Sequence, residues 1–110
     1  MREEVPPRFL EMMASRFAAL GDPTRLAIVH ALLKKGEQNV TTLAEATKTT
    51  AANVSKHLRL LKDAGLVARR KDGMQVFYKL DDPVVEKLCE LVCESLIDEC
   101  DSDADATGLR

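Results

Sequence analysis

The sequence predicts a mainly α-helical fold with one small β-hairpin, in which four helices precede the hairpin and a fifth follows it. Apolar residues recur every three or four positions in most segments, as on one face of a helix, and this period changes only between residues 66 and 80. The chain has 110 residues, enough for one small domain that buries a modest share of its surface. We therefore expect an oligomer.

The first two helices are expected over residues 8–20 and 24–35. Apolar side chains share one face of the first: Phe9, Met13, Phe17 and Leu20. We expect Gly21 to close this helix in a left-handed conformation, and Asp22 and Pro23 to supply the N-cap and first-turn proline of the next one. The second helix ends before Gly36 and presents Leu26, Ile28, Val29, Leu32 and Leu33.

The third and fourth helices form a close pair. Thr42, followed three residues later by Glu45, is a capping-box pattern that predicts a short helix over residues 42–48. Thr50 can cap a fourth helix, over residues 50–64, whose apolar residues keep helical spacing until Gly65 stops it: Val54, Leu58, Leu61 and Ala64. A helix, a short turn and a helix indicate a helix-turn-helix.

Two short extended runs follow, over residues 66–71 and 74–80, separated by Asp72 and Gly73, which favour a tight hairpin. A hairpin beside a helix-turn-helix is the wing of a winged helix-turn-helix. Asp81, Asp82 and Pro83 start the fifth helix, expected to run to about Glu99. Residues 1–100 are expected to form one domain, and 101–110 an acidic, disordered tail.

Charge is distributed unevenly along the chain. Residues 48–80 hold eight basic and two acidic side chains, a net charge of plus six, whereas residues 81–110 hold two basic and ten acidic ones. A local basic block is the electrostatic footprint of a nucleic-acid surface even in an acidic chain, although a merely solvated charged face would also produce it. Winged helices that bind proteins instead of DNA are the rival class of function, and this basic block disfavours that class.

In a helix-turn-helix the second helix enters the major groove while the first contacts the DNA backbone. Its early turns, with two neighbouring residues, provide the candidate DNA contacts: Thr49, Thr50, Asn53, Ser55, Lys56, His57 and Arg59. Asparagine can read adenine, and lysine and arginine more often contact phosphate. Ala51 and Ala52 offer only apolar contacts, so DNA shape is expected to contribute to specificity.

Three motifs resemble the ArsR/SmtB family of metal- and stress-responsive repressors, over residues 9–97. They are ALGDPTRLAIVHALL at 19–33, VSKHLRLLKDAGLV at 54–67 and the wing KDGMQVFYKL at 71–80. The resemblance implies a dimer with the first and fifth helices at its interface, which represses from an imperfect palindrome on double-stranded DNA until an inducer releases it. It also implies DNA contacts by Asn53, Ser55, His57, Arg70, Lys71 and Gln75. For His57, a packing or backbone-bonding role is the alternative.

At the positions where relatives bind their inducers, this chain lacks the ligand residues. The stretch corresponding to the arsenic-type site, residues 37–43, contains no cysteine, and Val84, Ser95 and Asp98 stand where the zinc-type site would need imidazoles or a carboxylate. The chain has only two histidines, which disfavours a zinc site with several imidazoles. The cysteine near the second helix that redox sensors of the family use is also missing.

The remaining sulfur ligands are Cys89, Cys93 and Cys100, which lie within a stripe about 40° wide on the last helix. Thiolates favour arsenite-type species, cadmium, lead, mercury or cuprous ions. Cys100 lies about 10.5 Å beyond Cys93 along a helix, so it must fold back, or a third ligand must come from the other subunit. Purely structural cysteines, or a switch by thiol oxidation, are the alternatives.

Other classes of protein are disfavoured. No run of about 18 apolar residues is present for a membrane span, MREEVPPR does not resemble a signal peptide, and three cysteines do not form a disulfide framework. The sequence therefore indicates a cytoplasmic protein. It contains no glycine-rich phosphate loop, nucleophile elbow or paired carboxylate and histidine, so we expect no enzyme.

Overall fold

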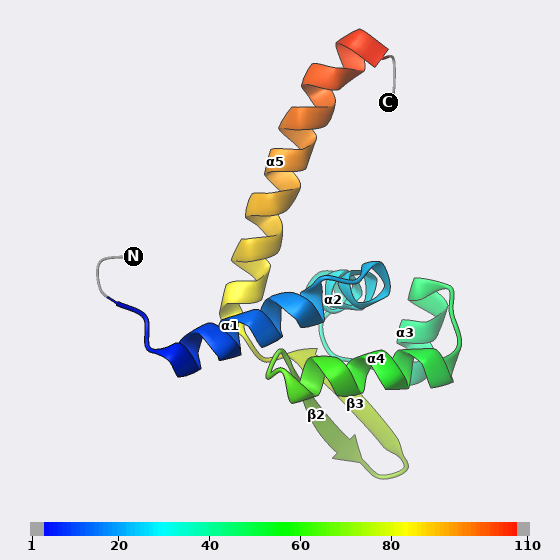
Figure 1. Ribbon diagram of the computed structural model, residues 1–110. Helices are drawn as coiled ribbons and strands as arrows, with labels where there is room; N and C mark the ends of the chain where they lie inside the picture. The colour runs from blue at the N-terminus through cyan, green and yellow to red at the C-terminus, as the bar shows by residue number, and fades with distance from the viewer. Residues whose placement is uncertain (1–3, 108–110) are drawn as a thin grey trace.

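The computed structural model describes residues 4–107, with side chains as far as Cys100. The elements follow the order α1 (Pro7–Leu20), α2 (Pro23–Lys35), β1 (Gln38–Asn39), α3 (Val40–Thr47), α4 (Ala51–Asp63), β2 (Val67–Asp72), β3 (Gln75–Leu80) and α5 (Pro83–Thr107). Figure 1 shows α4 and the β2–β3 hairpin on one side of the molecule, while α5 extends away from them on the other. The winged helix-turn-helix predicted from the sequence is confirmed.

The hydrophobic core lies between α2, α3, α4 and the base of the hairpin. The side chains that are almost completely buried are Ile28, Val29, Leu43, Val54, Leu58, Leu61 and Leu66. Burial of each such aliphatic side chain is worth roughly 1.5–3 kcal/mol. Val54, Leu58 and Leu61 are the apolar stripe predicted for α4, so the helical spacing in the sequence identifies the buried face correctly.

The junction between α1 and α2 is held by side-chain hydrogen bonds. Asp22 caps α2 as predicted, because its carboxylate accepts from the backbone N–H of Arg25 at 3.0 Å. Arg25 donates from Nε to the carbonyl of Ala19 at 2.6 Å and from Nη2 to that of Ala18 at 3.4 Å. The prediction of a left-handed conformation for Gly21 is wrong, since its φ is −82°. The guanidinium of Arg25 satisfies the carbonyl of Ala19, and it shares the carbonyl of Ala18 with the backbone N–H of Gly21.

The helix-turn-helix begins earlier than the sequence suggests. The N-cap of α3 is Asn39, whose side chain accepts from the backbone N–H of Thr42 at 2.9 Å, so the capping box at Thr42 and Glu45 is wrong. Thr50 caps α4 as predicted, accepting from the backbone N–H of Asn53 at 3.1 Å. Gly65, with a φ of +81°, lies in the left-handed region just after α4, as expected for the stop.

The hairpin belongs to a three-stranded antiparallel sheet of order β1-β3-β2. β1 was not predicted from the sequence, because a strand of two residues has no alternation to detect. Asp72 pairs with Gln75, so the loop is Gly73 and Met74, one residue later than predicted. Gly73 has a φ of +63°, which matches the glycine at the first central position of a type II′ turn.

The last helix is longer than expected. α5 continues to Thr107, beyond the predicted end near Glu99, and the backbone of residues 101–107 is helical rather than an irregular tail. The acidic composition suggested disorder, but no glycine or proline interrupts the chain between Pro83 and Gly108. The rest of the predicted tail, residues 108–110, lies outside the described residues.

Arg25→Ala removes the donor that Ala18, Ala19 and His57 share, and is expected to lower the free energy of unfolding by about 1–3 kcal/mol, because partly buried polar groups lose their partners. Urea unfolding at one fixed protein concentration measures this change, since the stability of a dimer depends on concentration. The matched control is Arg59→Ala, at an exposed arginine of α4, with an expected change below about 0.5 kcal/mol. Equal losses in both variants would contradict the role of Arg25.

Candidate functional site

The N-terminal end of α4 is exposed and carries an ordered set of polar side chains. Asn53 donates from Nδ2 to the hydroxyl of Thr49 at 3.0 Å, and its backbone N–H donates to the hydroxyl of Thr50. Ala51, Ala52, Ser55, Lys56 and Arg59 are exposed on the same helix, and Asn53 is half-buried. The amide of Asn53 is therefore oriented by the protein and retains its Oδ1 and one N–H for another partner.

His57 lies on a different side of α4 from the exposed residues. Its ring is half-buried, with Nδ1 3.2 Å from Nη1 of Arg25. Because a guanidinium can only donate, Nδ1 is the acceptor in this hydrogen bond. This contact corresponds to the packing role that the sequence analysis kept open for His57.

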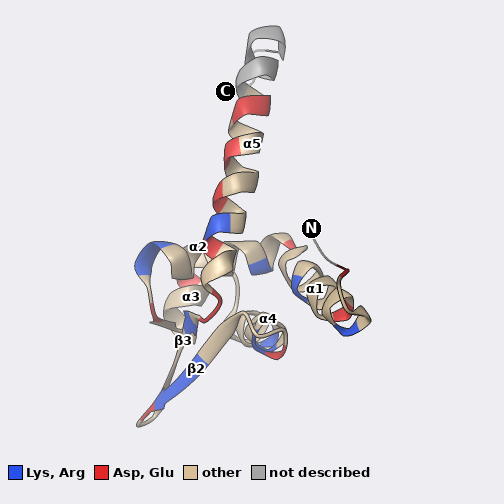
Figure 2. Cartoon of the chain, turned by 90° about the vertical axis from the view of Figure 1, so that its left-hand side faces the viewer, with Lys and Arg blue, Asp and Glu red and all other residues tan. Residues whose placement is uncertain are grey.

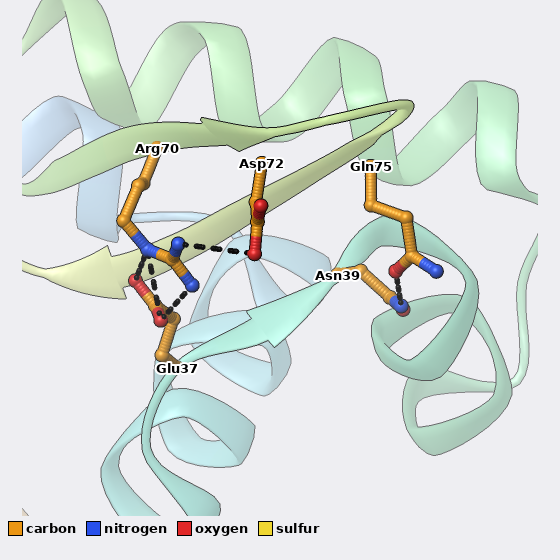
Figure 3. Close-up of polar contacts among 5 residues, drawn as sticks. All are labelled: Glu37, Asn39, Arg70, Asp72 and Gln75. Carbon is orange, nitrogen blue, oxygen red and sulfur yellow. Dashed lines mark hydrogen bonds and ion pairs between the residues drawn. The ribbon is translucent and has the colours of Figure 1, made fainter.

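The wing residues predicted to contact DNA differ in their surroundings. Lys71 is exposed, whereas Arg70 binds Glu37 and Gln75 accepts from Asn39 at 3.0 Å, as Figure 3 shows. Hydrogen bonding from Arg70 lowers the pKa of Glu37, and the same bond raises the pKa of Arg70. Glu37 was not predicted from the sequence, since its partner lies 33 residues away and no local pattern indicates the pair.

Charge is segregated in space as well as in sequence. Figure 2 shows Lys and Arg along the hairpin strands and on α4, and bands of Asp and Glu along α5. The basic side chains of α4 and the wing therefore lie at the opposite end of the described molecule from the acidic residues of α5. A polyanion would be attracted to this end and repelled from α5.

Two of the three cysteines line an apolar groove of about 420 Å³ between the end of α1, the start of α2 and α5. The groove is formed by Phe17, Leu20, Gly21, Leu26, Leu88, Cys89, Val92, Cys93 and Leu96. Cys89 is half-buried, while Cys93 and Cys100 are exposed, and Cys100 is not among the residues of the groove. Burial, and then the neighbouring Cys93, raise the pKa of the Cys89 thiol.

One chain does not assemble a complete metal site from the residues that the structure describes. Nowhere among them do three His, Cys, Asp or Glu side chains gather in an arrangement that could hold a metal ion. The groove brings together Cys89 and Cys93 from the predicted set and leaves out Cys100. A ligand held in the groove by this chain alone would have two sulfur donors.

Large apolar side chains on α1 and α5 remain uncovered in the single chain. The most exposed, between 46% and 66%, are Phe9, Leu10, Met12, Phe17, Val84, Leu91, Val92, Leu96 and Ile97. An apolar surface of this extent indicates a site of protein association. None of the helices within residues 4–107 is long and apolar enough to cross a membrane.

Comparison with known proteins identifies the helix-turn-helix directly, since a family model described as a helix-turn-helix domain matches residues 20–70. The chain is 42% identical over 78 residues to a cadmium resistance regulatory protein homolog of Staphylococcus aureus, and these residues span 71% of this chain and 64% of the relative. It is 39% identical to an uncharacterised HTH-type regulator of Methanocaldococcus jannaschii, over 76% of this chain and 94% of the relative. It is 33% identical to an arsenical resistance operon repressor of Bacillus subtilis, over 83% and 89%.

Solved structures agree with these relatives. The AntR antimony-specific transcriptional repressor superposes with a TM-score of 0.79 at 30% identity, covering 92% of this chain and 90% of that one. A homodimeric winged helix-turn-helix DNA-binding domain of Mycobacterium bovis, described as a possible ArsR-family regulator, gives a TM-score of 0.74 at 31% identity, covering 90% and 92%. These relatives are regulators rather than enzymes, as expected, and the chain belongs to the ArsR/SmtB family of winged helix-turn-helix transcriptional regulators.

Proposed function

We propose that this protein is a dimeric repressor that binds an imperfect palindromic operator through α4 and is released when a soft metal or metalloid binds at the cysteines of α5. The observation that carries the DNA-binding part is the exposed, hydrogen-bonded N-terminus of α4 beside a basic wing. The observation that carries the inducer part is the shared groove of Cys89 and Cys93. Action on chromosomal DNA implies a cytoplasmic protein.

A second copy of the chain is the partner that best fits the apolar faces of α1 and α5. One Mycobacterium bovis relative of the same fold is described as homodimeric. Two-fold symmetry would present two α4 helices to successive major grooves, which is the geometry that reads a palindrome. The exposed apolar side chains of α5 would then be buried between protomers, while the basic ends of both chains face the duplex.

The side chains of α4 suit different parts of DNA. Asn53 can pair with an adenine edge, and Ser55, Thr49 and Thr50 can donate to base or phosphate oxygens. Lys56 and Arg59 are exposed cations, and the protein does not orient them for reading bases. Such side chains are suited to contact phosphate. Lys71 would extend this contact to the wing, and His57, bonded to Arg25, would maintain the position of α4.

A thiophilic inducer fits both the groove and the relatives. Relatives are named for cadmium, arsenical and mercury resistance, and the AntR repressor is described as antimony-specific. On a helix, residues four apart have Cβ atoms about 5–6 Å from each other, whereas a disulfide needs about 3.5–4.5 Å. Cys89 and Cys93 can therefore bridge a large soft ion more readily than they can oxidise to each other. A third donor would be Cys100 or a cysteine of the second protomer.

Lys56→Ala is expected to weaken binding of all duplexes alike and to reduce the salt dependence of log K by about one charge, because a phosphate contact releases counterions. Binding is measured by fluorescence anisotropy against salt concentration, on a duplex selected from a random pool by the wild-type protein. Lys87→Ala on α5, an exposed lysine outside the proposed interface, is the matched control and should leave both quantities unchanged. Equal effects of the two substitutions would argue against an α4 interface.

A Cys89→Ser, Cys93→Ser double variant is expected to bind the selected duplex as the wild type does, but to stay bound when Cd²⁺ or arsenite is added. The wild type should dissociate under the same titration, because the inducer needs both thiols. Cys100→Ser is the matched control for one exposed cysteine, and its response tells whether Cys100 supplies the third donor. Unchanged inducer dependence in the double variant would rule out the proposed site.

The affinity for Cd²⁺ is expected to increase with pH between about pH 6 and 8, about tenfold per unit for each thiol proton that the ion displaces. The raised pKa of Cys89 keeps its thiol protonated throughout this range, so the ion competes with a proton there. No carboxylate or cation lines the groove. Titrations of Cd²⁺ at several pH values, followed by thiolate-to-metal absorption, measure the slope. An affinity independent of pH would show that thiol protons are not displaced.

A further inference from the structure

Of the four residues between α2 and α3, the last three, Glu37, Gln38 and Asn39, alternate between two sides of the chain. We call them the connector. Gln38 is 7% exposed and points into the fold, where its Nε2 donates to the carbonyls of Ala31 at 2.8 Å and Gly36 at 3.3 Å. Glu37 and Asn39 meet side chains of the wing. This alternation is that of an extended strand, so one short segment is anchored to α2 and contacts the wing at the same time.

The first contact with the wing is the ion pair of Glu37 and Arg70. Arg70 donates from Nη2 to Oε1 of Glu37 at 2.8 Å and from Nε to both carboxylate oxygens, at 3.1 and 3.2 Å. Its guanidinium also lies over the Phe77 ring, 4.9 Å from the centroid, and 3.6 Å from the carboxylate of Asp72. Bonds at two nitrogens and a stacked ring fix the direction of this side chain.

The second contact is made by Asn39, whose carboxamide serves both the wing and α3. Its Oδ1 accepts from the backbone N–H of Thr42 at 2.9 Å and so caps α3, while its Nδ2 donates to Oε1 of Gln75 at 3.0 Å. Figure 3 shows both wing contacts on one face of the sheet. The start of the helix-turn-helix and a residue next to the wing loop therefore share one side chain.

The outer part of the hairpin needs this support. β1 pairs with β3 only at Tyr78 and Phe77, and beyond that row the hairpin has two strands. A two-stranded ribbon is marginally stable by itself, so its direction relative to α4 depends on other contacts. The side chains of Glu37 and Asn39 extend the attachment from Phe77 towards Asp72 and Gln75.

We propose that the connector is a positioning element for the wing, in which Glu37 and Asn39 hold Arg70 and Gln75 so that the wing reaches DNA together with α4. Arg70 and Gln75 are then positioning residues, and of the three wing residues predicted to contact DNA only Lys71 is left to bind phosphate. This inference rests on the proposed DNA-binding function, and it assigns to Glu37 a role that no sequence motif indicates.

The direction in which one substitution changes the affinity for DNA distinguishes this positioning role from a purely electrostatic effect. Glu37 is an acidic residue next to a basic surface, so its removal by itself should strengthen DNA binding. If Glu37 only competed with phosphate for Arg70, the effect would have the same sign. A positioning role gives the opposite sign, because Arg70 and the wing lose their fixed direction when the ion pair is lost.

Glu37→Gln is expected to weaken binding to the selected duplex about two- to fivefold, the affinity equivalent of an exposed ion pair. Glu45→Gln on α3 removes an exposed acid near the same surface and is the matched control, with unchanged or tighter binding. Anisotropy titrations at one salt concentration measure both variants. Unchanged or tighter binding of Glu37→Gln would overturn the proposal.

The double variant Glu37→Arg, Arg70→Glu keeps the net charge and restores the pair in reverse. We expect it to bind within about threefold of the wild type, whereas Arg70→Glu alone should bind far more weakly than that. Failure of the reversed pair to rescue binding would mean that Arg70 contacts DNA itself. Hydrogen exchange of the free protein gives an independent readout, with faster exchange of the outer wing amides expected in Glu37→Gln. If the wild type selects no duplex, the proposed function fails, while this exchange experiment still tests the connector.

Discussion

The guanidinium of Arg25 determines how three helices meet. From α2 it donates to two carbonyls at the end of α1 and to the ring of His57 on α4. The backbone N–H of the same residue is held by Asp22, which caps α2 and whose pKa is lowered first of all by that bond. The carbonyl of Ala19 and the ring of His57 both find a partner in this side chain, which places α4 relative to both N-terminal helices.

This arrangement also connects the groove to α4, the helix proposed to bind DNA. The groove is lined by Phe17, Leu20 and Gly21, which flank the two residues whose carbonyls bind Arg25. A movement of α5 against the end of α1 therefore acts on a segment that is hydrogen-bonded, through Arg25, to α4. These contacts form a continuous path from the groove to α4. Coupling between the two sites along this path further requires that each site has two discrete arrangements.

Local patterns were sufficient for the features that depend on neighbouring residues. The apolar stripe of α4 and the caps by Asp22 and Thr50 lie within one or two turns of the chain, and sequence alone predicts them. The predicted cap of α3 was wrong, because Asn39 and Thr42 are both residues that can cap a helix, and the pairing of Asn39 with β3 is not visible in the local sequence. The predicted end of α5 was wrong because the acidic composition suggested disorder, although the sequence contains no helix-breaking residue between Pro83 and Gly108.

The contacts that define the candidate sites join residues far apart in sequence. Arg25 and His57 are separated by 32 residues, and Glu37 and Arg70 by 33. Nothing in either local sequence indicates its partner. The sequence placed Arg70 and Gln75 on the wing correctly but could not show that each is already bound. It also placed three cysteines on one face, whereas only the fold shows that two of them share a groove.

The position of that groove limits what any inducer can do. A ligand shifts an equilibrium only by the difference between its affinities for the two states, and DNA must then weaken inducer binding by the same factor. The groove lies between α5 and α1, the helices whose apolar faces a single chain leaves exposed. A ligand that bridged Cys89 and Cys93 without altering the packing of α5 would bind the free and DNA-bound forms equally and release nothing. Regulation therefore requires that the ligated groove and the DNA-competent arrangement of these two helices be incompatible.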